Sequence, residues 1–155
     1  MLPAEQRLLA LIESGGPHDK DELLALFDQL KPISFETLKG EWSGGWFETG
    51  HPAGRWMKEI RWVGAAFRSP HDIDPIIARG DDGKKKVLDE WGHAKLFEAK
   101  FRGLVSAVVV YDKHPIVDYF RSVNDDFVMG LMERTEWRDS GLSFFYLLRE
   151  KSVEP

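Results

Sequence analysis

The sequence contains no cysteine, and this absence excludes disulfides, thiolate nucleophiles, iron–sulfur clusters and cysteine-ligated zinc. It has no apolar run near the roughly 20 residues that a membrane-spanning helix requires. The formal net charge of −5 leaves no positive excess for binding a nucleic-acid backbone. The first residues lack the basic-then-apolar order of a signal peptide. We therefore expect a cytoplasmic protein with no membrane span and no nucleic-acid partner.

Aromatic residues are abundant instead, with six tryptophans, ten phenylalanines and three tyrosines among 155 residues. Several tryptophans fall close together, at Trp42, Trp46, Trp56 and Trp62. Large aromatic side chains either fill a core or line a cavity that stacks on a ligand. A chain of this length, 43% hydrophobic, can bury a core without disulfides or metal, so we expect a single domain over 1–155.

The spacing of apolar residues predicts a helical segment over 1–39. One helix is expected at 3–13, and a Ser-Gly-Gly-Pro break separates it from a second helix at 19–30. Asp19 is a suitable N-cap for the second helix, and Glu22 three residues later completes a capping-box pattern.

After residue 39 the pattern changes to short runs of β-branched and aromatic residues separated by Gly, Pro and Asp, which is typical of strands. The segment 64–80, which contains two prolines, is expected to be a long loop over one end of the sheet. Short turns favour a meander, so the predicted fold is mainly β: an antiparallel up-and-down β-barrel of about eight strands with N-terminal helices. The strands are expected at 41–48, 55–63, 85–91, 94–102, 104–111, 115–123, 126–133 and 142–149.

Gly40, Trp42 and Gly44 form a Gly-x-Trp-x-Gly motif where the last helical turn meets the first strand. Gly40 permits a tight turn from helix to strand, and Gly44 allows a neighbouring strand or a ligand to approach. Trp42 is expected to point inward and plug the base of the barrel.

Residues 40–52, which contain this motif, resemble the start of the bacterial GXWXG-motif family. The resemblance implies that 40–100 and 101–150 are two parts of one barrel, and the family carries no assigned enzymatic activity. The domain of unknown function that adjoins the motif in this family is similar to the stretches 103–112, 115–121 and 127–132.

The Gly-x-Trp start is also similar to the first-strand signature of lipocalins and other calycins, which are ligand-binding barrels. In those folds the tryptophan packs under an arginine from the last strand, and Arg149 stands at the matching place. The resemblance therefore implies a calycin-like barrel with a structural cation–π contact between Trp42 and Arg149, worth roughly 1 kcal/mol.

The aromatic set is larger than a filled barrel of this size requires. It favours an aromatic-lined cavity for a hydrophobic or amphiphilic molecule, such as a fatty acid, a phospholipid or an apolar metabolite. The residues expected to contact this ligand are His51, Trp46, Trp56, Trp62, Phe67, Phe101, Tyr111, Phe120, Arg121 and Tyr146.

Two polar residues in this set have alternative interpretations. His51 stands between a glycine and a proline, so it either contacts the ligand at the barrel mouth or holds the turn through a loop carbonyl. Arg121 suits a carboxylate or phosphate head group, or else pairs with a charge on a neighbouring strand. Asp118 lies three residues earlier, on the opposite face of a regular strand, so one of the two residues, or a bulge in the strand, is expected to place charge toward the interior or the surface.

Two other kinds of function stay open from the sequence. One is a small hydrolase, isomerase or haem-dependent enzyme that uses His51 and Arg121 in the same cavity, and the other is a filled barrel acting as an interaction domain, with homodimerisation open. No catalytic residue or cofactor is predicted. No metal site is predicted either, because His71, Asp72 and Asp74 match no recognised ligand spacing. Haem remains an alternative, because some Gly-x-Trp-x-Gly barrels hold it through one histidine.

Overall fold

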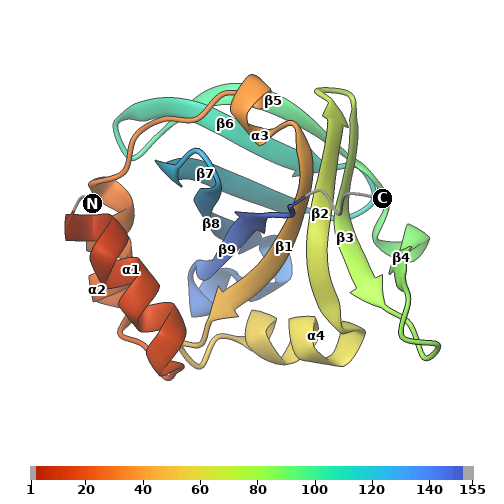
Figure 1. Ribbon diagram of the computed structural model, residues 1–155, viewed down its shortest axis with the longest axis horizontal. Helices are drawn as coiled ribbons and strands as arrows, with labels where there is room; N and C mark the ends of the chain where they lie inside the picture. Colours follow the sequence, from red (N-terminus) through yellow and green to blue (C-terminus); the bar gives the residue numbers. More distant parts are fainter. Residues whose placement is uncertain (1–2, 152–155) are drawn as a thin grey trace.

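The computed structural model describes residues 3–151, which form nine antiparallel strands (Figure 1). Neighbouring strands follow the order β2-β1-β9-β8-β7-β6-β5-β3, and β2 also pairs with β3, so eight strands close into a ring and β4 extends β3 outside it. Because chain neighbours are sheet neighbours around the ring, the predicted up-and-down barrel is confirmed. The strands are β1 (Gly40–Phe47), β2 (Trp62–Ser69), β3 (Asp72–Arg79), β4 (Lys85–Val87), β5 (Ala94–Phe101), β6 (Leu104–Tyr111), β7 (Ile116–Asn124), β8 (Phe127–Arg134) and β9 (Ser143–Arg149).

The N-terminal helices cover one side of the barrel wall (Figure 1). Asp19 caps α2 by accepting from the Asp21 backbone N–H at 2.9 Å, whereas Glu22 pairs with Arg7 of α1 and does not complete the capping box. The chain also contains the helices α1 (Pro3–Ser14), α2 (Lys20–Asp28), α3 (Phe35–Leu38), α4 (Pro52–Ile60), η1 (Asp89–Trp91) and η2 (Thr135–Ser140).

Helix α4 replaces a predicted strand, so the expectation for 55–63 is wrong. His51 caps the helix, Pro52 occupies its first turn, and Arg61 ends it in the left-handed region at φ 60°. Two aromatic residues in this run imitate a strand pattern, but the buried residues Ala53 and Met57 recur at a spacing of four. Helix α4 runs beneath the ends of β1 and β2 (Figure 1).

The segment 64–80 forms most of the β2–β3 hairpin, which corrects the expectation of a long loop. Pro75 lies within β3 where the pairing with β2 shifts register, and a proline is tolerated at such an irregularity because it has no N–H to donate. On the other side, β3 pairs with β5 only at Ile73 and Ala94. The predicted strand over 85–91 is also shorter, because β4 ends at Val87 and η1 follows.

The Gly-x-Trp-x-Gly motif is built as the sequence predicts. Gly40 has φ 124°, a conformation that disfavours side chains, and Trp42 is buried with its indole N–H donating to the Leu38 carbonyl at 2.7 Å. The Arg149 guanidinium lies 4.3 Å from the centre of the Trp42 ring, so the predicted cation–π contact is present. A Cβ on Gly44 would overlap the Trp62 ring, which therefore needs glycine beneath it.

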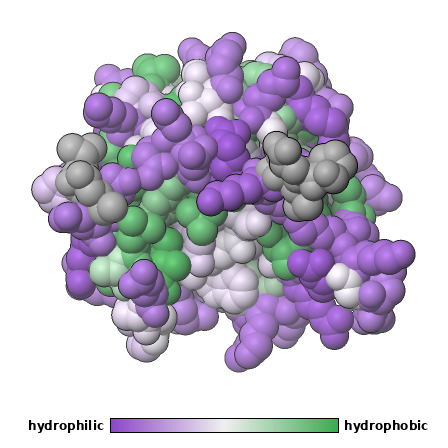
Figure 2. Space-filling model, viewed as in Figure 1, coloured by the Kyte–Doolittle hydropathy of each residue, from purple (hydrophilic) through white to green (hydrophobic). Residues whose placement is uncertain are grey.

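Two apolar clusters lie on the two faces of the barrel wall. The inner cluster lies inside the ring and includes Trp42, Phe67, Val109, Phe120, Met132 and Phe145. The outer cluster joins α1 and α2 to the wall and contains Ala4, Leu8, Leu11, Leu23, Leu26, Phe27, Leu30, Phe47, Val123, Phe127, Met129, Leu131 and Phe144. The outer surface of the molecule is mainly hydrophilic on the face seen in Figure 2, with smaller hydrophobic areas.

Candidate functional site

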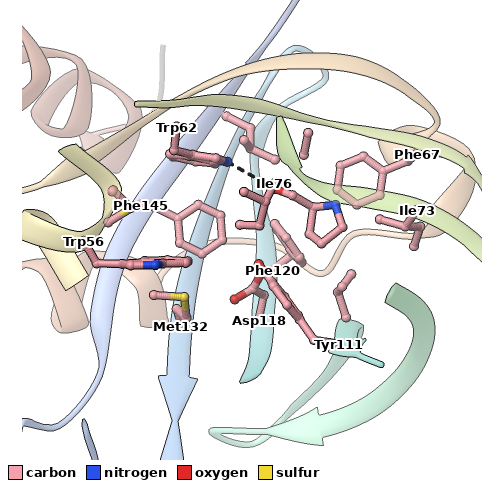
Figure 3. A pocket seen from close by; sticks show the side chains of 15 residues that line it. Trp56, Trp62, Phe67, Ile73, Ile76, Tyr111, Asp118, Phe120, Met132 and Phe145 are labelled. Atoms are coloured by element: carbon pink, nitrogen blue, oxygen red, sulfur yellow. Dashed lines mark hydrogen bonds between the residues drawn. The ribbon is translucent and has the colours of Figure 1, made fainter. Parts of the chain in front are cut away.

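A small cavity lies inside the barrel, within the inner cluster (Figure 3). Its volume is about 20 Å³, and a single water needs about 10–15 Å³. The side chains around it come from α4 and from six strands of the ring, and most of them are aromatic or aliphatic. The lining residues are Trp56, Met57, Trp62, Ala65, Phe67, Ile73, Pro75, Ile76, Val109, Tyr111, Asp118, Phe120, Met132, Phe145 and Leu147.

Asp118 is the one carboxyl group in this lining. It follows from the alternation of β7, in which Ile116, Asp118 and Phe120 share the inner face. The Tyr111 hydroxyl donates to Asp118 Oδ2 at 3.1 Å, whereas Oδ1 has no hydrogen-bond partner among the described residues. Figure 3 shows the carboxyl group lying between Tyr111, Phe120 and Met132.

Burial decides the charge of this carboxyl group. Desolvation raises the pKa of Asp118 to about 8, although the hydrogen bond from Tyr111 lowers it in part. Burial also raises the pKa of Tyr111 well above that of an ordinary tyrosine. The cavity lining includes no lysine, arginine or histidine that could favour the carboxylate. At neutral pH the Asp118 carboxyl is therefore mostly protonated, and it can gain or lose a proton near that pH.

Arg121, predicted to meet a ligand, lies on the outer face of β7. Its Nη1 donates to the Phe27 carbonyl at 3.0 Å, and its Nη2 donates to the carbonyls of Phe101 and Arg102 at 3.2 and 3.3 Å. These bonds tie the end of α2 to the β5–β6 turn, and the guanidinium also lies 4.6 Å from the Phe27 ring centre. Of the two alternatives for β7, the structure places the acid inside and the arginine outside.

His51 is the N-cap of α4 and does not line the interior cavity. Its Nδ1 accepts from the Ala53 backbone N–H at 3.0 Å, and its Nε2 donates to the Gly141 carbonyl at 3.0 Å. These partners require the neutral ring with the proton on Nε2. Burial lowers the pKa of His51, against the hydrogen bond to Gly141, so the neutral form is favoured. The geometry matches the interpretation in which histidine holds the turn.

Three partly buried tryptophans, Trp56, Trp91 and Trp137, pack against the inner cluster, and we name them, with Arg134, the tryptophan cluster. The Arg134 guanidinium lies 6.0, 5.3 and 4.7 Å from the ring centres of Trp56, Trp91 and Trp137. Trp56 also packs edge-on against the other two rings, at 4.7 and 5.7 Å. Because Trp56 belongs both to this cluster and to the cavity lining, α4 connects the tryptophan cluster with the cavity.

Family models match two successive parts of the chain. The family model described as GXWXG protein matches residues 25–83, and the one described as Domain of unknown function (DUF4334) matches residues 92–149. A crystal structure of a protein from Thermomonospora curvata is 37% identical, with a TM-score of 0.90 over 97% of this chain and 100% of that chain. The chain belongs to the GXWXG family. No protein among the curated ones that were compared matches it.

The motif that gives the GXWXG family its name lies where α3 is followed by β1, outside the cavity lining. Of the ten side chains predicted to contact a ligand, those of Trp56, Trp62, Phe67, Tyr111 and Phe120 do line the cavity.

The other aromatic predictions point elsewhere in this GXWXG protein. Trp46 lines a surface groove beside α4, and Phe101 stacks on Tyr119 outside the barrel at 3.8 Å. Tyr146 lies on the outer wall, 5.2 Å from the Phe47 ring. Strand alternation would have found Asp118 and Phe145, the latter because it is two residues from Leu147 on β9.

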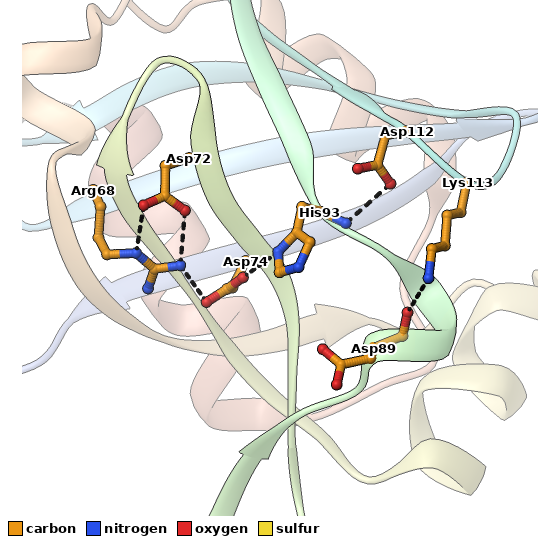
Figure 4. A network of polar contacts seen from close by, with 7 residues as sticks. All are labelled: Arg68, Asp72, Asp74, Asp89, His93, Asp112 and Lys113. Atoms are coloured by element: carbon orange, nitrogen blue, oxygen red, sulfur yellow. Dashed lines mark hydrogen bonds and ion pairs between the residues drawn. The ribbon is translucent and has the colours of Figure 1, made fainter.

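A polar network joins β2, β3 and the start of β5 on the outside of the barrel (Figure 4). Arg68 donates to both Asp72 and Asp74, and Asp74 also accepts from His93 Nδ1 at 2.7 Å. This network lies where β3 and β5 share a single backbone pair, so it supports a weak junction of the ring. Over residues 3–151, no cluster of three histidine or acidic side chains suits a metal ion.

Within the part of the chain that the structure describes, none of the helices is long and apolar enough to span a bilayer.

Proposed function

We propose that this protein binds a small, largely apolar molecule inside the barrel and that one polar group of the molecule meets Asp118. The observation that carries the proposal is the Asp118 Oδ1 atom, which is buried and without a protein partner in an aromatic cavity. A buried polar atom left unpaired costs about 1–3 kcal/mol. A ligand group that hydrogen-bonds this atom removes that penalty, while the walls supply apolar contact.

The chemistry of the lining narrows the ligand class. A fatty acid or a phospholipid carries an anion, which would meet the Asp118 carboxyl in a lining without cationic side chains. Removing an anion from water without a cationic partner is strongly unfavourable, and the protonated carboxyl and the unpaired Trp56 indole N–H offer it neutral donors only. Among the classes expected from the sequence, an apolar metabolite without an acidic group therefore fits best.

Ligand entry requires the barrel end to open, because a volume of about 20 Å³ is far below the 300 Å³ or more of ordinary ligand pockets. Trp56 is the lining residue best placed to move, because it sits on a helix of nine residues outside the ring. Its indole N–H and that of Trp91 are buried without partners, so the tryptophan cluster is not tightly hydrogen-bonded. In this proposal, α4 and Trp56 swing away together and enlarge the cavity.

Solvent extraction of the purified full-length protein, followed by mass spectrometry, tests the proposal. We expect the wild-type protein to release an apolar molecule of low mass. Asp118→Asn should retain no more than about one tenth of the wild-type amount, because the carboxyl interaction is lost. Asp139→Asn is the matched control, because Asp139 is exposed and its carboxyl is far along the chain from β7. Equal retention by all three proteins would count against a role for Asp118.

A second function, acid–base catalysis, is favoured by the titration of Asp118 near neutral pH. A carboxyl group with a pKa of about 8 can give a proton to a bound molecule and take one back. The earlier candidates, His51 and Arg121, do not line this cavity, so Asp118 with Tyr111 would carry such chemistry. Conversion of the extracted molecule by the wild-type protein, and its absence in Asp118→Asn, would distinguish catalysis from binding.

A further inference from the structure

We propose that the ligand of this cavity is an amine whose ammonium group pairs with Asp118 between aromatic rings. This inference rests on the proposed function and adds the charge of the ligand's polar group. It depends on three features of the described residues: the position of the carboxyl group, the character of the walls, and the absence of any other charge in the lining.

The carboxyl group offers a cation an acceptor that no protein group uses. Tyr111 donates to Oδ2, and Oδ1 accepts from no described residue. An ammonium group has several N–H donors and a full positive charge, so it can satisfy Oδ1 and neutralise the carboxylate in one contact. An alcohol at the same place makes a neutral hydrogen bond, which is roughly half as strong.

The walls favour a cation over other polar groups. Rings from α4, β2, β6, β7 and β9 surround the space in front of the carboxyl group (Figure 3). Phe120 packs edge-on against both Phe67 and Phe145, at 6.0 and 5.6 Å, so neighbouring rings differ in orientation. A cation is attracted to the face of an aromatic ring, and the attraction grows when water is excluded.

No other charged side chain lines the cavity around Asp118, and Arg134 of β8, which lies against the Trp56 ring, is paired with Glu136. Tyr111 of β6 is the one other titratable side chain in the lining. The lining residues from α4, β2, β3, β8 and β9 are all uncharged. A cationic ligand therefore meets an uncompensated acid, whereas an anionic ligand meets a like charge when the carboxyl group is ionised.

Ammonium binding should release a proton from Asp118. Burial raises the pKa of this carboxyl group to about 8, so below that pH the group must lose its proton before it can pair with a cation. The affinity for an ammonium ion should rise about tenfold per pH unit between pH 6 and pH 8 and then level off. The affinity for a neutral isostere should change little, and that for a carboxylate isostere should fall over the same range.

Three isosteric probes test the inference: benzylamine, benzyl alcohol and benzoate. Calorimetric titrations of the full chain at pH 6, 7 and 8 give the affinities, and titrations in two buffers of different ionisation heat give the proton release. We expect benzylamine to bind at least about tenfold more tightly than benzyl alcohol at pH 8, with nearly one proton released per ligand at pH 6. Benzoate should bind most weakly.

Trp56→Ala separates the charge preference from the opening of the barrel, because it removes the indole that narrows the cavity. Asp118→Asn in that background should abolish both the preference for benzylamine and the proton release, with melting curves confirming that the variants fold. If benzyl alcohol binds as tightly as benzylamine at every pH, the amine assignment is overturned, but the proposal that the cavity binds a ligand stands. Failure of every probe in both wild type and Trp56→Ala overturns the pocket itself.

Discussion

Strand β7 carries one charged side chain on each face of the barrel wall, and the two are buried in opposite ways. On the outer face, Arg121 directs its donors at the carbonyl oxygens of Phe27, Phe101 and Arg102. On the inner face, Asp118 accepts one hydrogen bond from a tyrosine and leaves an oxygen without a partner. Both residues are almost fully buried, at 3% and 5% exposure.

The difference separates a group that serves the fold from one that does not. Buried polar groups in folded proteins are normally hydrogen-bonded, and Arg121 follows that rule while it links α2 to the wall. Asp118 breaks this rule at Oδ1, which has no partner among the described residues. Its position also places an ionisable group in an apolar interior. Arg121 should therefore support stability, whereas Asp118 should oppose it when ionised.

The largest effect is expected from Asp118→Asn as a function of pH. The folded pKa of about 8 lies above that of an unfolded aspartate, so the folded state holds the extra proton between these values. The wild-type free energy of unfolding should fall by about 1.4 kcal/mol per pH unit relative to the variant as pH rises from 5 to 8, or about 4 kcal/mol in all. Above pH 8 the difference should become constant.

Urea unfolding of both proteins at pH 5, 6, 7, 8 and 9 measures this difference. Groups that titrate elsewhere affect both proteins alike and cancel in the comparison. Asp139→Asn should follow the wild-type curve, because its carboxyl is exposed. Parallel pH curves for wild type and Asp118→Asn would show that the inner carboxyl is not destabilised by burial.

Arg121→Met should have the next largest effect, lowering the free energy of unfolding by about 3 kcal/mol. The methionine keeps the apolar stem but leaves the three carbonyl oxygens without their charged donor. Arg102→Met is the matched control, because Arg102 makes a partly exposed ion pair with Asp28 and should lose less than about 1 kcal/mol. Thermal and urea unfolding measure both, and equal losses would contradict a special role for the outer arginine.

The fold was largely readable from the sequence because most strands have local patterns that tertiary contacts do not override. The last five strands match their predicted ranges within one or two residues. The errors fall where two cues conflict. Helix α4 carries aromatic residues typical of strands, and the helix is decided by its caps at His51 and Arg61. Strand β3 contains Pro75, which is accommodated because its partner strand shifts register there.

The candidate site was only half readable, because residue type does not say which face of a strand points inward. Aromatic content identified five of the lining residues, but of the two charged residues on β7 it was Arg121, and not Asp118, that was predicted to contact the ligand. The spacing showed that these two residues lie on opposite faces of β7. Which of them points inward depended on a contact far away in the sequence, the packing of α2 against the outer wall. A signal existed in the sequence: Asp118 alternates with Ile116 and Phe120.

The smallest effect sharpens the comparison with a third buried polar residue. His51→Ala removes the N-cap of α4 and the bond to Gly141, so stability should fall by about 1.5 kcal/mol at pH 8. Because burial lowers the pKa of His51, its stabilisation is present above the unfolded pKa of about 6.5 and is lost as pH falls below it. The stability loss caused by His51→Ala should therefore shrink at pH 5, whereas replacing the exposed His71 by alanine should change stability little at either pH.

Benzylamine binding should survive in His51→Ala, because the hydrogen-bond partners of His51, like those of Arg121, belong to the protein. A loss of binding in this variant would show that His51, like Asp118, serves the ligand.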